Sequence, residues 1–201
     1  MIHPTALISY QPMRSPALGR PTQEQPAAVI GDGIRVGAYA VIYAGAWIGR
    51  DCFVGEHAVI REGCRIGDRC LIGQGVFFNY EAEIGDDVRI IQGAHIAGLA
   101  RIGSGTFIGP GVMMSNVRHI DVNNQVFDYR DAAAPVIGER VMIGTGANIV
   151  AGVRIGDRAV IAAGAIVTRD VPAGGFVRGQ PGRLVERTAL DVADAEGTTG
   201  L

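Results

Sequence analysis

The sequence predicts an all-β fold, a parallel β-helix in which short strands wind into stacked coils, and three observations support this. From Ile30 onward an apolar residue recurs at every sixth position, and the recurrence resumes at Ile137 after a gap. A small or β-branched residue stands four positions after most of these apolar anchors. No helical pattern lies between the repeats. A short fixed period of this kind indicates a solenoid whose coils bury a continuous core against one another.

The anchors and the small residues between them predict the strands. Because residues two apart on an extended strand point to the same side, each anchor shares its inward face with the small residue two positions before it. Three hexads per coil then give about seven coils, about 34 Å tall at about 4.8 Å per strand spacing. The anchors are Ile30, Val36, Ile42, Ile48, Val54, Ile60, Ile66, Ile72, Phe78, Ile84, Ile90, Ile96, Ile102, Ile108, Met114, Ile137, Ile143, Ile149, Ile155, Ile161 and Val167.

The repeat and its interruptions divide the chain into three parts. Residues 1–28 form an N-terminal cap and an irregular loop, since 9–28 is rich in proline and lacks apolar periodicity. Residues 29–171 form the β-helix, with a loop inserted at 116–135. Residues 172–201 form a short C-terminal cap, for which we expect one short helix, and a polar tail.

An 18-residue step sorts the anchors into three faces, which begin at Ile30, Val36 and Ile42. Glycine follows most anchors of the first and second faces, where we expect corners with positive φ. None follows an anchor of the third face, and Ile137 resumes the first face after the inserted loop. An apolar outward stripe on a solenoid indicates a subunit contact, so we predict a symmetric homo-oligomer packed along the third face. The outward residues of that face are Val41, Val59, Phe77, His95 and Met113.

Composition excludes several classes of function. The formal net charge is -2 and charged residues make up 19% of the chain, which argues against a nucleic-acid partner. No run of 18 apolar residues predicts a membrane span, and the N-terminus has no apolar core of a signal peptide. The chain has 3 cysteines, Cys52, Cys64 and Cys70, all at the small inward position, where we expect them to fill the core. We therefore expect a cytoplasmic protein with reduced thiols.

Several motifs carry a resemblance to a known family. The stretch VIGERVMIGTGANIVAGVRIGDRAVIAAGAIVTRDVPAGGFVRGQPGRL resembles the C-terminal half of hexapeptide-repeat acyltransferases. With IHPTA at the N-terminus and GPGVMMSN before the inserted loop, the chain is similar to the branch that N-acetylates aminosugars on sugar nucleotides. The resemblance implies a left-handed β-helix, a homotrimer, acetyl-CoA as acyl donor in the cleft between subunits, and a small-molecule acceptor.

The resemblance also implies donor-binding residues. Backbone around Gly144, Ala162 and Ala163 would line the pantetheine arm of CoA. Thr168 and Arg169, in IVTRD, stand where the family has Thr-Lys near the CoA nucleotide. Arg183, in GQPGR, matches the arginine of the family's G-x-P-A-R, with Gly182 in place of alanine. Arginine suits phosphate because its planar fork donates two hydrogen bonds at once.

Four residues are candidates for the acceptor site. Acyl transfer to an amine needs a group that removes a proton, and histidine is the usual base near neutral pH. His95 projects from the third face, and His119 lies in the inserted loop, so both are candidate catalytic bases. The segment GAHIAGLARIG resembles NAHIAHD of acyl-carrier-protein-dependent sugar acyltransferases, but the catalytic histidine of that motif corresponds here to Gly98. Asn79 and Asn116 are candidate acceptor-binding residues. A neutral amine could also attack without a protein base.

Two alternatives remain open on the same fold. A metalloenzyme like the γ-class carbonic anhydrases needs three histidines at one metal. We expect no metal site, because His57, His95 and His119 occupy different phases of the repeat. A non-catalytic assembly module is the second alternative, because a fold does not by itself imply a function.

Overall fold

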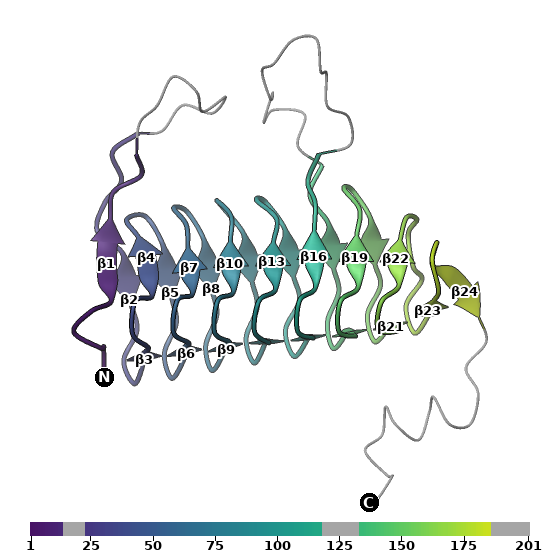
Figure 1. Ribbon diagram of the computed structural model, residues 1–201, viewed down its shortest axis with the longest axis horizontal. Coiled ribbons are helices and arrows are strands. Elements are labelled where there is room, and N and C mark those ends of the chain that lie inside the picture. The colour runs from purple at the N-terminus through teal and green to yellow at the C-terminus, as the bar shows by residue number, and fades with distance from the viewer. Residues whose placement is uncertain (14–22, 118–132, 186–201) are drawn as a thin grey trace, which may run out of the picture.

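The computed structural model describes residues 1–13, 23–117 and 133–185 of the 201. In these ranges every regular element is a strand, and the strands stack as a left-handed parallel β-helix of about seven coils (Figure 1). The predicted fold class is therefore confirmed. The described ranges contain no helix of the length and hydropathy needed to cross a bilayer.

Each face of the sequence pattern becomes one sheet, and the sheets take the numbers of the faces. The first sheet consists of β2 (Val29–Ile30), β5 (Trp47–Ile48), β8 (Arg65–Ile66), β11 (Glu83–Ile84), β14 (Arg101–Ile102), β17 (Val136–Ile137) and β20 (Arg154–Ile155). The second sheet consists of β3 (Arg35–Val36), β6 (Phe53–Val54), β9 (Leu71–Ile72), β12 (Arg89–Ile90), β15 (Phe107–Ile108), β18 (Met142–Ile143), β21 (Val160–Ile161), β23 (Phe176–Arg178) and β24 (Arg183–Val185). The third sheet, which faces the viewer in Figure 1, consists of β1 (Leu7–Tyr10), β4 (Val41–Tyr43), β7 (Val59–Ile60), β10 (Phe77–Phe78), β13 (His95–Ile96), β16 (Met113–Met114), β19 (Asn148–Ile149) and β22 (Ile166–Val167).

The register across the inserted loop follows the predicted phase. Ile102 of β14 pairs with Ile137 of β17, so the first sheet continues after the loop without a shift. Met114 pairs with Ile149 in the third sheet in the same way. The turn that follows a strand of the first, second or third sheet is called the first, second or third corner. The inserted loop leaves the coil at the third corner, after β16.

The core is the column of inward residues that the repeat predicts. Apart from Ile30, which is partly buried against the core, the anchors are at most 6% exposed. The three free cysteines lie in the same column, with exposures of 0–2%, and burial raises the pKa of the Cys64 thiol to about 12. The cysteines fill the core as small apolar side chains, as expected.

The expected reason for the corner glycines is wrong. Gly31 and Gly67, which directly follow anchors, do not have positive φ. A Cβ on Gly31 would lie 2.6 Å from the backbone nitrogen of Arg50 in the next coil, so close stacking of coils requires glycine there. Positive φ instead occurs two residues later in the corner, at Gly33 and also at non-glycine residues such as Asp51 and Arg69.

Both ends contribute strands that the hexad pattern does not predict. Ser9 and Tyr10 belong to β1, which pairs with β4 and so extends the third sheet toward the N-terminus. The described part of the C-terminal cap is the antiparallel pair of β23 and β24, without the expected short helix.

Exposed apolar side chains occur on all three sheets. On the first sheet, Trp47 is 41% exposed. The third sheet presents Phe77 and Met113, which are 36% and 44% exposed, in agreement with the predicted stripe. The second sheet presents Leu71 and Met142, which are 37% and 39% exposed. The sequence pattern indicated such a stripe on the third face alone.

Candidate functional site

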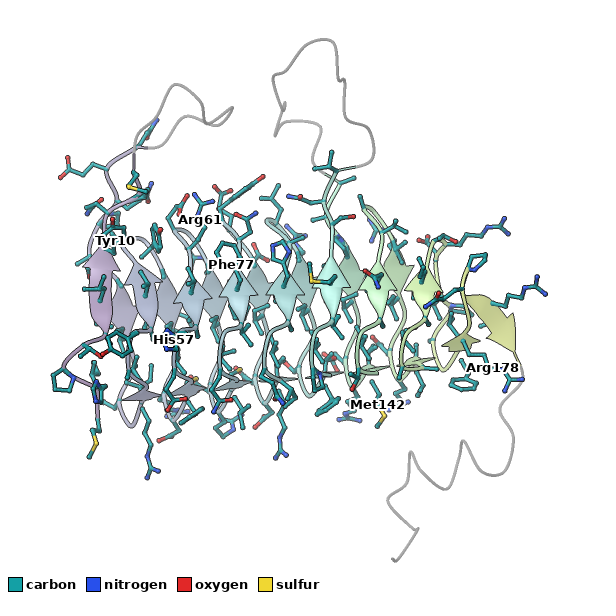
Figure 2. All side chains as sticks on the ribbon, viewed as in Figure 1. Tyr10, His57, Arg61, Phe77, Met142 and Arg178 are labelled. Carbon is teal, nitrogen blue, oxygen red and sulfur yellow. The ribbon has the colours of Figure 1, made fainter. Side chains whose placement is uncertain are left out.

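The third corner differs from the other two because no glycine directly follows its anchors, whereas glycine follows most anchors of the first and second faces. Arg61 directly follows Ile60, and its guanidinium forms two hydrogen bonds to the carboxylate of Glu62, from Nη2 to Oε1 (2.7 Å) and from Nε to Oε2 (3.1 Å). Glu62 is 2% exposed, so this carboxylate is a buried charge. Figure 2 shows Arg61 on the edge above the third sheet, with Phe77 on the sheet below it. A line of polar side chains therefore runs along this edge of the solenoid.

Asn79 belongs to this line. Its Oδ1 accepts hydrogen bonds from Arg61 Nη1 and from the backbone nitrogen of Tyr80, both at 3.0 Å. The Arg61 guanidinium also lies 5.9 Å from the ring centroids of Tyr43 and Tyr80, within the range of a cation–π contact. Asn79 is thus part of an internal network and does not line the cavity described next.

A cavity of about 540 Å³ opens on the third sheet toward its C-terminal end. His95 projects into it from β13, and Asn116 contributes from the corner after β16. Its other described lining residues are Met113, Met114, Ser115, Asn148, Ile149, Val150 and Ile166. We call it the His95 cavity. His95 and Asn116, two of the predicted acceptor-site residues, therefore line the same cavity.

His95 is half-buried, and its ring lies edge-on to Phe77 of the preceding coil, with centroids 5.4 Å apart. Burial lowers the pKa of His95 below its ordinary value of 6.5, because the apolar surroundings disfavour the charged imidazolium. The imidazole is therefore neutral at neutral pH, which is the form that accepts a proton.

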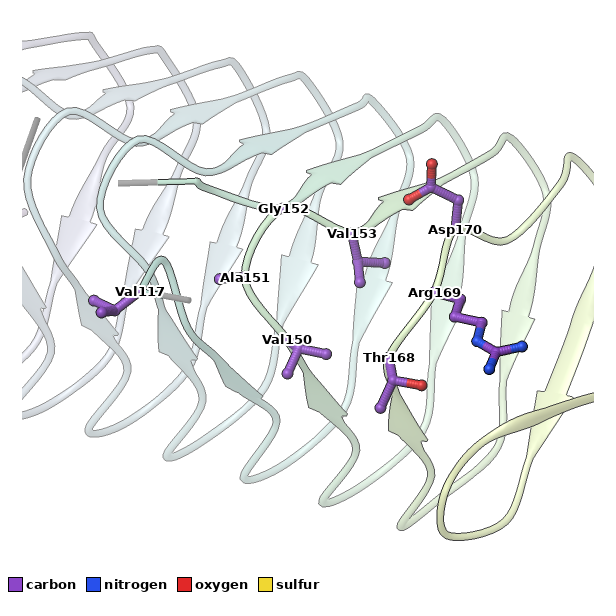
Figure 3. A pocket seen from close by; sticks show the side chains of 8 residues that line it. All are labelled: Val117, Val150, Ala151, Gly152, Val153, Thr168, Arg169 and Asp170. Carbon is purple, nitrogen blue, oxygen red and sulfur yellow. The ribbon is translucent and has the colours of Figure 1, made fainter. Parts of the chain in front are cut away.

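A second cavity of about 400 Å³ lies round the third corner and shares Val150 with the first. Thr168, Arg169 and Asp170 line one side of it, after β22, and Figure 3 shows the Arg169 guanidinium on this side, directed away from Val150. Asp170 Oδ1 accepts a hydrogen bond from the backbone nitrogen of Arg154 (2.8 Å), which fixes the turn. We call this the Arg169 cavity.

The remaining donor-site residues lie at the second corner, on the opposite edge of the third sheet. Gly144, Ala162 and Ala163 stack in adjacent coils, and a Cβ on Gly144 would lie 2.5 Å from the backbone nitrogen of Ala163. The turn between β23 and β24 covers this edge, since Gly182 N donates to Ile166 O (2.7 Å). Arg183 follows that turn and is exposed. The structure thus divides the six predicted residues between two edges of one sheet.

Two of the remaining histidines, His3 and His57, lie away from this site. His119 lies outside the described residues. His57 is at the second corner near the N-terminal end, where its ring stacks on Tyr39 with centroids 5.3 Å apart. His3 bonds Thr5 in the N-terminal cap (3.0 Å). Among the described residues, no three of the histidine, cysteine, aspartate and glutamate side chains are grouped as a metal ion would require.

Sequence reasoning missed two residues that build this site. Tyr80 reaches across Gly98 to Asn116, and Val150 joins the two cavities. The pattern did contain one signal for Tyr80, since it stands 18 residues before Gly98 and 36 before Asn116, at the same corner position.

Comparison with known proteins identifies the repeats. Residues 27–62, 45–79 and 134–169 match the family described as bacterial transferase hexapeptide (six repeats). The chain therefore carries the hexapeptide repeats of the bacterial transferases, and the resemblance to this family is confirmed.

Two relatives are informative about chemistry. A 2,3,4,5-tetrahydropyridine-2,6-dicarboxylate N-acetyltransferase of Staphylococcus aureus is 50% identical over 66 residues, which are 32% of this chain and 27% of the relative. The chain thus spans about a quarter of the length of the curated relatives it matches. A hexapeptide-repeat acetyltransferase of Vibrio cholerae, solved with acetyl-CoA, is 27% identical with a TM-score of 0.53, covering 62% of this chain and 70% of that one.

A third comparison supports the fold alone. The UDP-N-acetylglucosamine acyltransferase of Francisella novicida has a TM-score of 0.54 at 18% identity, and the match covers 99% of this chain and 74% of that one. The similarity therefore extends over nearly the whole solenoid.

Proposed function

We propose that the protein is an acyltransferase that moves an acetyl group from acetyl-CoA to an amine bound in the His95 cavity. The observation that carries this proposal is the pairing of a neutral, half-buried histidine with a buried asparagine in one cavity that adjoins the Arg169 cavity. The acetyltransferase of Vibrio cholerae, solved with acetyl-CoA, supports the choice of donor.

The chemistry needs one base and no redox partner. The lone pair of a neutral amine attacks the thioester carbonyl carbon, forming a C–N bond, and the C–S bond then breaks to release CoA as its thiolate. The amine loses one proton in the process. His95 accepts that proton and returns it to the thiolate, which restores the neutral imidazole. His119 stays a second candidate for this role.

The donor is expected to lie along an edge of the third sheet. Gly144, Ala162 and Ala163 present a surface without large side chains, against which a pantetheine arm can lie. Arg169 and Arg183, on opposite edges of the sheet, are exposed cations that suit the phosphates of the CoA nucleotide, and Thr168 directly precedes Arg169.

A homotrimer would join the two halves of this donor site. Because the halves occupy opposite edges of the third sheet, one chain does not bring them together. Rotational symmetry with the third sheets toward the axis sets the second corner of one chain beside the third corner of the next. The exposed Phe77 and Met113 would then be covered by neighbouring subunits.

The acceptor is proposed to be an amino group on a sugar or sugar nucleotide. The proposal rests on the resemblance of the motifs to that branch of the family. The proposed use of acetyl-CoA supports a cytoplasmic setting.

Calorimetric titration with acetyl-CoA tests the donor site. The unmodified protein should bind about one acetyl-CoA per chain, and an Arg169→Ala, Arg183→Ala double variant should bind at least about tenfold more weakly, because two charge-assisted contacts are lost. The matched control is the Arg35→Ala, Arg89→Ala double variant, which removes two arginines from the outward row of the second sheet. Absence of heat with the unmodified protein would contradict the proposal and favour an assembly module.

A further inference from the structure

Asn116 has a buried side-chain carbonyl to which no described residue donates a hydrogen bond. It is 8% exposed, and its Nδ2 donates to the carbonyl oxygen of Gly98 (3.1 Å) and to the hydroxyl of Tyr80 (3.4 Å). A carbonyl oxygen only accepts hydrogen bonds, so the nitrogen of the amide must face Gly98. Asn116 Oδ1 is left without a hydrogen bond within residues 1–13, 23–117 and 133–185.

Tyr80 holds this arrangement in place. A Cβ on Gly98 would lie 2.8 Å from Cζ of the Tyr80 ring, so the ring occupies the space in which a side chain at position 98 would start. Tyr80 is 6% exposed, and the Asn79 hydrogen bond fixes its backbone nitrogen. The glycine therefore admits the tyrosine, and the tyrosine positions its hydroxyl at the Asn116 amide.

An unsatisfied buried carbonyl is costly unless a ligand or a water molecule donates to it. Asn116 lines the His95 cavity, in which His95 offers a neutral ring nitrogen as a second acceptor. Two acceptors on residues that line one cavity suit a group with at least two hydrogens. A primary amine has enough hydrogens for both, whereas the single hydrogen of a hydroxyl satisfies only one.

We propose that Tyr80 is a positioning residue that fixes the Asn116 amide, so that its carbonyl oxygen selects a primary amine over a hydroxyl as the acceptor in the His95 cavity. The proposal rests on the acyltransferase function proposed above and names the residues that select its amine acceptor. Within it, Asn116 binds the amine and His95 removes the proton.

The test uses the full chain saturated with CoA and two matched probes, glucosamine and glucose, which differ in one amino group. Binding is measured by nuclear magnetic resonance from the side-chain amide signal of Asn116, so the result does not depend on turnover. Glucosamine should shift this signal and glucose should not. In Asn116→Ala the amide signal is lost, and glucosamine affinity, followed on the His95 ring signal, should fall at least about tenfold, to the level of glucose.

Tyr80→Phe separates positioning from packing, because it keeps the ring over Gly98 and removes only the hydroxyl. It should raise the KM for glucosamine about three- to tenfold, change kcat by less than about twofold and leave the pH profile of His95 unchanged. Tyr39→Phe is the matched control, since Tyr39 is exposed at the second corner, and it should change neither constant.

The outcomes separate this inference from the proposed function. Equal binding of both probes, binding of neither, or unchanged glucosamine affinity in Asn116→Ala overturns the inference when acetyl-CoA still binds. If the unmodified protein does not bind acetyl-CoA, the proposed acyltransferase function is overturned, and the inference with it.

Discussion

At the scale of single residues, burial decides the chemical state of the candidate base. His95 stands on an apolar strand beside Phe77, and this environment lowers the pKa of its imidazole. A solvent-exposed histidine would be partly protonated near pH 6.5, and a protonated ring cannot accept a proton. The position of His95 on the sheet therefore keeps it in the basic form at neutral pH.

Activity should depend on pH through this residue. Because the pKa of His95 is lowered, the loss of kcat/KM that comes from His95 should appear only as the pH drops through a value below 6.5, in addition to any loss from protonation of the acceptor amine. His95→Ala should lower kcat by a factor on the order of 10²–10⁴ and abolish this acid limb. Steady-state rates of CoA release between pH 5 and 8 provide the measurement. An acid limb below pH 6.5 that is unchanged in His95→Ala, once the protonation of the acceptor amine is subtracted, would assign the base to another residue, such as His119.

At the scale of elements, the third corner stabilises the site through a buried ion pair. The Glu62 carboxylate is 2% exposed and bonds both Nε and Nη2 of Arg61. Arg61 also bonds Asn79, which bonds the backbone of Tyr80, so the pair is connected to the residue that orients Asn116. Elsewhere in the solenoid ion pairs are more exposed, as between Arg50 and Asp68, whose side chains are 67% and 23% exposed.

Removal of Arg61 should therefore cost more stability than removal of Arg50. Arg61→Ala takes a bidentate partner from a buried carboxylate and should lower the free energy of unfolding by roughly 2–4 kcal/mol. Arg50→Ala, the matched control, should lower it by less than about 1 kcal/mol, because that pair is open to solvent. Urea denaturation measures both values. Equal losses for the two variants would show that Glu62 does not depend on Arg61.

At the scale of the whole molecule, the proposed donor site needs more than one chain. The second corner carries Gly144 and Ala163, and the third corner carries Arg169, with the width of the third sheet between them. Exposed apolar residues occur on the first and second sheets as well as the third. Oligomer geometry is therefore the property that decides whether the two corners form one site.

Substitutions at two residues of nearly equal exposure distinguish the third sheet from the second as the subunit interface. Phe77 on the third sheet and Leu71 on the second are 36% and 37% exposed. Phe77→Glu should convert the proposed trimer to monomers and weaken acetyl-CoA binding at the same time, because a buried charge opposes association. Leu71→Glu should remain trimeric and bind normally. Sedimentation velocity gives the mass of each variant, and dissociation by Leu71→Glu alone would move the interface to the second sheet.

The hexad repeat determined nearly all of the solenoid. Each anchor lies where the six-residue period puts it, and the pairing of Ile102 with Ile137 follows from the 18-residue step alone. This succeeds because inward residues depend only on their position in the coil. The strands at the two ends were not predicted. β1 and the pair of β23 and β24 follow no hexad and instead pair with neighbouring strands of the solenoid.

The sequence by itself thus determined the coil, its three faces and His95 and Asn116 as candidates for one site. Only the tertiary structure decided how these side chains are used. Asn79 is engaged by Arg61, Asn116 presents an oxygen because Gly98 and Tyr80 engage its nitrogen, and the predicted donor residues lie on two edges. The physical reason is that a repeat fixes the direction in which a side chain points, whereas hydrogen-bond partners depend on neighbours in other coils, 18 or more residues away in the chain.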